Sequence, residues 1–139
     1  MISFKSLTRQ TEIGANCYLL KIGNKRILID AGMHPKEEGK KSLPDFSSIY
    51  EHDLDAAILS HAHLDHSGSM PIVQRHYPEM PVMMTEATST LSQALLHNSV
   101  NVMTSKRNEL GLDEYPFFTH REIHKISKRW YHRRTEKKF

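Results

Sequence analysis

The 139-residue chain is poor in cysteine and contains no long hydrophobic run. Its single cysteine, Cys17, excludes an intramolecular disulfide and is typical of proteins from a reducing compartment. No apolar segment approaches the ~20 residues that span a bilayer, and the first residues lack the apolar centre of a signal peptide. The length suits one domain. The sequence therefore predicts a soluble, cytoplasmic protein without a membrane segment.

Positive charge is scarce until the last part of the sequence. Residues 1–120 hold eleven Lys and Arg against fourteen Asp and Glu, whereas residues 121–139 hold eight against two. This contrast predicts a domain over 1–120 followed by a basic C-terminal helix or tail over 121–139. Its cations could contact phosphates while Trp130 and Tyr131 stack on bases. A solvated helix face or a frayed end is the more common cause of such a charge run.

The order of apolar segments predicts an α/β fold. Two strands over 16–22 and 25–30, joined by a turn at Gly23-Asn24, form an expected hairpin. The segments that we expect further along are a loop over 31–52 with one helical turn near 44–50, strands over 55–60 and 81–84, and helices over 67–77, 85–103 and from 120 onward. The residues expected near one face of the helix over 85–103 are Leu91, Ala94, Leu95 and Val100.

The stretch "SHAHLDHSG" places four potential metal ligands within six positions. His61 and His63 are separated by a small alanine, so a bent loop can turn both imidazoles toward one ion, while Asp65 and His66 can serve a second. Imidazole and carboxylate ligands suit Zn²⁺, with Mn²⁺ or Fe²⁺ as alternatives. The alternative without a specific site is a histidine-rich surface loop that binds metal only adventitiously. The preceding strand and the turn at Gly68 favour a built metal site.

This stretch resembles the HxHxDH signature of the metallo-β-lactamase superfamily. The segment "NCYLLKIGNKRILIDAG" is similar to the opening hairpin of that family, whose terminal aspartate corresponds to Asp30. The resemblance implies a metallo-β-lactamase-like αββα sandwich, with Asp30 as a buried hydrogen-bond acceptor beneath the metal loop. "MTEATSTLSQALLHNSV" and "FFTHREIHKI" further resemble the β-CASP branch, the RNA- and DNA-processing nucleases that include RNase J and the 3′-end-processing endonucleases.

The sequence departs from this family after residue 100. The family completes its two-metal site with later histidines and a bridging aspartate, in "GH" and "SGD" segments that this chain lacks. We therefore expect only the N-terminal half of the fold. The other histidines are expected to be surface residues rather than ligands: His34, His52, His76, His97, His120, His124 and His132.

Half a fold leaves a sheet edge and an apolar face uncovered. Self-association as a homodimer is the cover that we expect. A truncated product with a rearranged core is one alternative. In the other, the C-terminal helix folds back with Ile123, Ile126 and Trp130 on one stripe.

The resemblance implies a metal-dependent hydrolase of β-CASP type that cleaves RNA, or DNA, phosphodiesters with a metal-bound hydroxide. His61, His63, Asp65 and His66 would hold one or two zinc ions, and Asp65 would position the nucleophile and take its proton. One ion shared by His61, His63 and either Asp65 or His66 is the mononuclear alternative. The other function classes are a non-catalytic metal-binding or interaction module and a small-molecule hydrolase of the glyoxalase-II or lactonase type.

Overall fold

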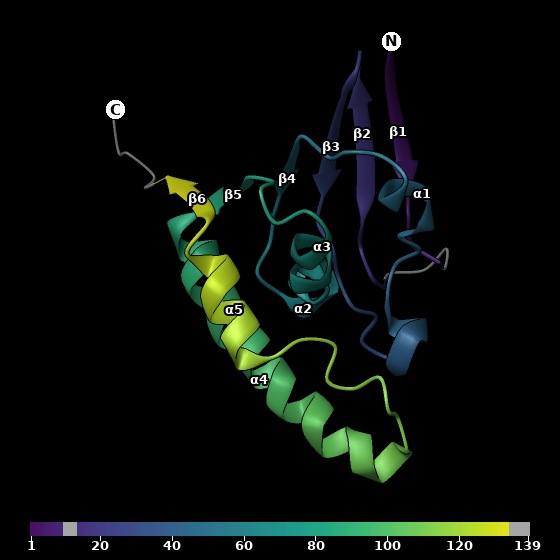
Figure 1. Cartoon of the computed structure of the whole chain (residues 1–139), viewed down its shortest axis with the longest axis vertical. Coiled ribbons are helices and arrows are strands. Elements are labelled where there is room, and N and C mark those ends of the chain that lie inside the picture. The colour runs from purple at the N-terminus through teal and green to yellow at the C-terminus, as the bar shows by residue number, and fades with distance from the viewer. Residues whose placement is uncertain (10–13, 134–139) are drawn as a thin grey trace.

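The predicted hairpin belongs to a six-stranded sheet in which the strands follow the order of the chain, from β1 to β6 (Figure 1). The computed structural model describes residues 1–9 and 14–133. The strands are Ile2–Ser6 (β1), Tyr18–Ile22 (β2), Lys25–Ile29 (β3), Ala56–Ile58 (β4), Val82–Thr85 (β5) and Trp130–Arg133 (β6). The pairs β1–β2 and β2–β3 are antiparallel, and the pairs from β3 to β6 are parallel.

The hairpin of β2 and β3 confirms the predicted pairing. Its turn begins at Gly23, whose φ of +59° is a conformation that glycine adopts without steric cost. The predicted strands over 55–60 and 81–84 are β4 and β5, each shorter than or displaced from the predicted range. Because the parallel strands end at one edge of the sheet, the residues that follow them meet there.

The helices are short except for one. They are the 3₁₀ helix η1 (Gly39–Ser42) and the α-helices α1 (Ser47–Tyr50), α2 (Leu64–Ser67), α3 (Met70–His76), α4 (Glu86–Leu110) and α5 (His120–Ser127). Thr85 caps α4 by accepting a hydrogen bond from Thr88 N, and Thr119 caps α5 in the same way from Glu122 N. The helix that we predicted over 85–103 is therefore confirmed, but it continues to Leu110 and ends at Gly111, which has a left-handed conformation.

The buried face of α4 matches the predicted one only in part. Val100 is buried as expected and Leu95 is partly buried, but Leu91 is 50% exposed and Ala94 is also exposed. The residues that α4 buries are Ser89, Ser92, Leu96, Ser99, Val100 and Met103. Serine occupies three of these positions, and its small side chain allows neighbouring elements to approach the helix closely. Hydrophobicity alone therefore predicted the buried face correctly at Val100 and wrongly at Leu91 and Ala94.

The expectation of a long C-terminal helix was wrong. The helix α5 ends at Ser127, and Trp130 lies in β6 rather than on a helical stripe with Ile123 and Ile126. β6 pairs with β5, so the unpaired backbone groups of that edge favour a strand over a continued helix. Trp130 is 6% exposed, and its indole N–H donates to Gln74 Oε1 at 2.9 Å. The segment still covers the core, but as an edge strand. Residues 134–139 of the predicted tail lie outside the described residues.

The two faces of the sheet are covered unequally. On the inner face, Leu28, Ala57, Val82 and Trp130 are register partners on four adjacent strands and are all buried. Met70, Val73 and Leu96 from α3 and α4 belong to the same buried core, and Figure 1 shows α3 in front of the sheet with α4 and α5 below β5 and β6.

The opposite, outer face carries a second register row. Ile29, Ile58, Met83 and Tyr131 are its members, and the last three are 38%, 44% and 66% exposed. Ile2, Phe4 and Ile22 are also exposed on the neighbouring strands β1 and β2. We call the row from Ile29 to Tyr131 the outer row. The chain thus supplies one sheet with helices on one side, as expected for part of a sandwich fold.

None of the helices in the described ranges, 1–9 and 14–133, has the length and apolarity needed to cross a membrane. The longest, α4, has 25 residues but is rich in serine, threonine and charged side chains.

Candidate metal centre

The loop after β4 carries the histidine cluster and is fixed through its backbone. It contains the one-turn helix α2, and the carbonyl groups of that turn accept hydrogen bonds from the segments before β2 and after β3. Asn16, Ala31 and Met33 donate their backbone N–H groups to the carbonyl oxygens of Asp65, His66 and Leu64 at 2.8, 2.8 and 2.7 Å. The carbonyl groups of Asp65 and His66 are therefore satisfied from outside the short helix, and that of Leu64 accepts from Met33 N as well as from Gly68 N. We call residues 60–69 the metal loop.

Two glycines allow this close approach. A Cβ atom on Gly32 would lie 1.8 Å from the carbonyl oxygen of Asp65, and one on Gly68 would lie 2.6 Å from the carbonyl oxygen of Leu64. Backbone atoms cannot move aside as a flexible side chain can, so neither position accommodates even alanine without a shift of the loop. The glycine of "DAG" is thus required by its contact with the histidine loop.

Asp30 joins the end of β3 to this loop. It is 2% exposed and adopts a φ of +61°, which aspartate tolerates better than most residues. Its Oδ1 accepts from Ser60 N at 2.8 Å, and its Oδ2 accepts from Ser60 Oγ at 2.6 Å and from His66 Nδ1 at 2.8 Å. The structure therefore places Asp30 beneath the loop, in contact with one of the four proposed ligands.

These contacts define the tautomer of His66. Because a carboxylate only accepts hydrogen bonds, His66 Nδ1 carries the proton that it donates to Asp30. The amide nitrogen of Asn16 lies 3.4 Å from His66 Nε2 and can only donate, which leaves Nε2 as the acceptor. A histidine whose Nδ1–H is held by a carboxylate and whose Nε2 keeps its lone pair is in the form that binds a metal ion.

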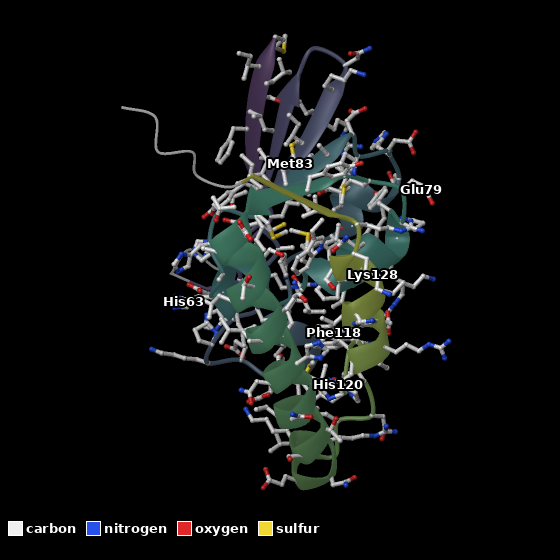
Figure 2. The ribbon with its side chains drawn as sticks, turned by 90° about the vertical axis from the view of Figure 1, so that its left-hand side faces the viewer. His63, Glu79, Met83, Phe118, His120 and Lys128 are labelled. Atoms are coloured by element: carbon white, nitrogen blue, oxygen red, sulfur yellow. The ribbon has the colours of Figure 1, made fainter. Side chains whose placement is uncertain are left out.

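His61 and His63 face each other at the surface of the loop. His61 Nε2 lies 2.7 Å from His63 Nδ1, and their rings meet edge to face with centroids 4.3 Å apart. The His61 ring also lies 5.2 Å, centroid to centroid, from that of His66. Figure 2 shows His63 at the flank of the molecule, beside α4. Two imidazole nitrogens that converge in this way match the donor chemistry of a zinc site.

Asp65 completes the four proposed ligands. Its Oδ2 lies 3.7 Å from His66 Nε2, and both side chains are a little more than a quarter exposed. The donor set therefore fits a divalent metal in chemistry. Among the residues that the structure describes, however, no group of three or more His, Cys, Asp or Glu side chains has the arrangement of a single metal site.

Sequence reasoning missed three residues of this site. Asn16 bridges the loop, since its amide nitrogen also donates to Asp65 O at 3.1 Å. Ser60 holds Asp30 with both its N–H and its hydroxyl group, and Gly32 provides the space for the loop. Asn16 and Ser60 each stand beside a motif that was recognised, but nothing in their spacing distinguishes them from ordinary loop residues.

The expectation of surface exposure was wrong for one of the other histidines. His34 is 6% exposed, and its Nδ1 accepts from Lys36 N at 3.1 Å, because the loop over 31–52 folds over it instead of extending into solvent. His52, His76, His120 and His124 are exposed, and His97 is partly exposed. The side chain of His132 lies outside the described residues.

The mixed sheet carries a histidine- and aspartate-rich loop at the carboxyl ends of its parallel strands, which is where α/β proteins commonly build their sites. The family model of the metallo-beta-lactamase superfamily matches residues 11–124. This match covers most of the chain, and the chain belongs to the metallo-β-lactamase superfamily. The expected resemblance and fold class are thereby confirmed.

Individual relatives agree with the β-CASP resemblance and with the expectation of a nuclease-type hydrolase. The chain is 32% identical over 123 residues to Endoribonuclease YSH1 of Saccharomyces cerevisiae. The alignment covers 86% of this chain and 16% of that protein. The chain is 33% identical over 118 residues to Integrator complex subunit 11 of Danio rerio, covering 81% of this chain and 19% of that protein. The chain thus spans less than a fifth of the length of either relative.

Among solved structures, the chain is similar to AidC, a dizinc quorum-quenching lactonase. The alignment has 20% identity and a TM-score of 0.49, and it covers 90% of this chain and 45% of that one.

Proposed function

We propose that this chain forms part of a metal-dependent nuclease that hydrolyses RNA phosphodiesters, with DNA as the alternative substrate. The observation that carries the proposal is the metal loop itself, in which His61 and His63 converge while His66 is held by buried Asp30. The names of the relatives, in particular Endoribonuclease YSH1, support RNA as the substrate class.

The loop residues have distinct roles in this proposal. His61 and His63 would hold one zinc ion, and Asp65 and His66 a second, with Mn²⁺ or Fe²⁺ as alternative metals. A divalent metal bound here would polarise the phosphoryl group and make water a usable nucleophile at neutral pH. Asp65 would orient the attacking water and accept its proton, because its carboxylate is partly exposed beside the histidines. Asp30 would hold His66 in the tautomer that presents Nε2.

The test is cleavage of labelled single-stranded RNA by the zinc- or manganese-loaded protein, with His63→Ala as the matched control. We expect cleavage by the wild type and a loss of at least about a hundredfold in the variant, since it removes one member of a converging ligand pair. Equal rates for the two proteins would overturn the nuclease proposal. Turnover of a lactone or thioester without RNA cleavage would favour a small-molecule hydrolase instead.

A non-catalytic metal-binding or interaction module is the second candidate. One observation favours it: within the described ranges, no three ligand side chains are arranged around a single ion. The metal content of protein purified without added metal separates the two candidates. Less than about half an equivalent of transition metal would favour the module, because a complete site binds far more tightly.

Self-association is the partner arrangement that the outer row supports. Ile58, Met83 and Tyr131 form an exposed apolar surface, and such surfaces are typical of interfaces. We propose a homodimer through this face, with the cytoplasm as its compartment. Sedimentation should show a dimer for the wild type and a monomer for Met83→Lys, and a monomer for both would exclude the homodimer.

A further inference from the structure

A groove begins at the metal loop and runs along α4. Its volume is about 540 Å³, and His63 and Asp65 form part of its wall. On one side lies the segment from Met33 to Glu38, and on the other side lies α4. The groove is therefore continuous with the candidate metal centre, although only two of the proposed ligands line it. Its volume falls within the range of small-molecule pockets, roughly 300–1,000 Å³.

The α4 side of the groove is built from one face of the helix. Leu95, Asn98, Val102 and Lys106 recur at intervals of three and four residues, which places them in a single line. Met103 from the same helix and Met33 from the opposite segment also line the groove. Most of the lining is apolar, with thioether and branched aliphatic groups that pack well against a flat ring.

The far end of the groove is closed by a polar cluster in which the charges are already paired. Lys106 donates to Glu38, and Tyr115 donates to the second oxygen of Glu38 at 2.7 Å. Burial opposes ionisation of Glu38, but the hydrogen bonds from Lys106 and Tyr115 outweigh it and lower the pKa of Glu38. Burial raises the pKa of Tyr115 to about 12, so its hydroxyl group stays protonated. Lys106 thus already has an anionic partner in Glu38.

We propose that this groove binds the base of the nucleotide next to the cleaved phosphate of a single-stranded RNA. The inference rests on the proposed nuclease function, because it takes the metal loop as the place where the phosphate is attacked. It adds a specificity site: the base lies between Met33 and the Val102–Met103 face of α4, and the amide of Asn98 hydrogen-bonds to its edge.

The charges of the groove favour a base over a phosphate. Lys106 is the only lysine or arginine among the described residues that line the groove, and its pairing with Glu38 leaves no net positive charge there to attract the RNA backbone. An uncharged, flat and polarizable group needs no such charge and gains contact with the apolar lining, which is the chemistry by which proteins hold unstacked bases.

The first experiment follows the methionine methyl groups by NMR while a five-nucleotide RNA with hydrolysis-resistant phosphorothioate linkages is added. We expect shifts at Met33 and Met103 and none at Met83, which lies on the outer face and serves as the internal control (Figure 2). The same RNA with an abasic central nucleotide should bind at least about fivefold more weakly, since stacking of one base contributes ~1–3 kcal/mol. Unmoved Met33 and Met103 signals, or equal affinity for the abasic RNA, would overturn the inference.

A matched pair of variants on α4 supplies the second experiment. Val102→Gln places an uncharged polar group in the groove, and Leu91→Gln makes the corresponding change at a residue outside it on the same helix. The two residues are 43% and 50% exposed, so both variants should fold. We expect RNA affinity to fall about threefold to tenfold for Val102→Gln and to stay unchanged for Leu91→Gln. A similar affinity for both variants would contradict a role for the groove.

The two proposals fail in different ways. Methyl shifts at Met33 and Met103 without RNA cleavage would support the base site and overturn the nuclease function. Cleavage that depends on His63, together with unmoved groove methyl groups, would support the nuclease function and overturn the base site.

Discussion

Two regions at the end of β4 differ in how fully this chain builds them. The metal loop begins at Ser60, and its backbone and buried Asp30 are bonded to neighbouring segments on every side. The outer row passes through Ile58, only two residues earlier, and there the apolar side chains of β4, β5 and β6 remain exposed. The backbone of the metal loop is held by hydrogen bonds within this chain, whereas the apolar side chains of the outer face are not covered by other described residues.

This difference shows that the two regions have different sources of stability. The geometry of the loop depends on segments that lie within this chain, around Asn16, Asp30 and Gly32. The side chains of the outer row are exposed in the folded chain as they are in the unfolded chain, so they contribute little to the free energy of folding. They would contribute more only when another surface covers them. The loop should therefore respond strongly to changes within the chain, and the outer row weakly.

The largest expected effect comes from Gly32→Ala. The added Cβ would lie 1.8 Å from the carbonyl oxygen of Asp65, so the loop must move or the protein must unfold. We expect the free energy of unfolding to fall by about 4 kcal/mol or more, measured by urea denaturation. Gly111→Ala is the control, since its Cβ meets no atom within 4 Å and only its φ of +66° is strained; it should cost about 1–2 kcal/mol. Equal losses for both variants would show that the loop is not closely packed.

The second prediction compares adjacent methionines on the two faces of β5. Met84 is 8% exposed on the inner face, whereas Met83 is 44% exposed in the outer row. At a protein concentration low enough to keep the chain monomeric, we expect Met84→Ala to lower the free energy of unfolding by about 2–5 kcal/mol and Met83→Ala by less than about 1 kcal/mol. Both values come from the same denaturation assay. The proposed homodimer predicts a larger loss for Met83→Ala at high protein concentration, whereas equal losses for the two variants in the monomer would contradict the difference between the two faces.

The sequence predicted those parts of the fold that depend on local pattern. The hairpin of β2 and β3 follows from β-rich segments around Gly23-Asn24, and the cluster from His61 to His66 is recognisable by its spacing alone. The position of Asp30 beneath the loop followed from the family resemblance, since a strand that ends in Asp-Ala-Gly is common.

The parts that sequence reasoning missed depend on contacts between distant segments. The helix α4 buries three serines beside Leu96 while Leu91 stays exposed, because close packing selects small side chains at those positions. Trp130 lies in a strand because β5 offers an open edge, which no local pattern reveals. Asn16 reaches Asp65 across 49 residues of sequence, and an isolated asparagine carries no signal of such a contact.

The third prediction tests whether the hydrogen bond from His66 to Asp30 orients His66 for metal binding. Asp30 Oδ2 accepts hydrogen bonds from Ser60 Oγ and His66 Nδ1. In Asp30→Asn an amide group replaces the carboxylate, and its NH₂ group cannot accept hydrogen bonds. We expect zinc affinity to fall about 10- to 100-fold in a calorimetric titration, because the partner of a ligating histidine fixes its tautomer. Asp53→Asn, at an exposed position, is the control and should bind zinc like the wild type. Unchanged affinity in Asp30→Asn would separate the Asp30–His66 contact from metal binding.

The smallest expected effect concerns a partly exposed polar contact between α4 and α5. His97 Nδ1 lies 2.7 Å from His120 Nδ1, so one nitrogen must donate and the other accept, and protonation of both rings removes the bond. Burial, followed by the nearby His120 and His124, lowers the pKa of His97 below its ordinary value of 6.5. The unfolded chain therefore binds more protons than the folded one as the pH falls below about 6.5, and stability must decrease with it. The Tm of the wild type should drop more between pH 7.5 and 5.5 than that of His97→Gln, whereas His52→Gln, at an exposed position, should match the wild type. An equal drop in all three proteins would show that the contact between α4 and α5 does not respond to pH.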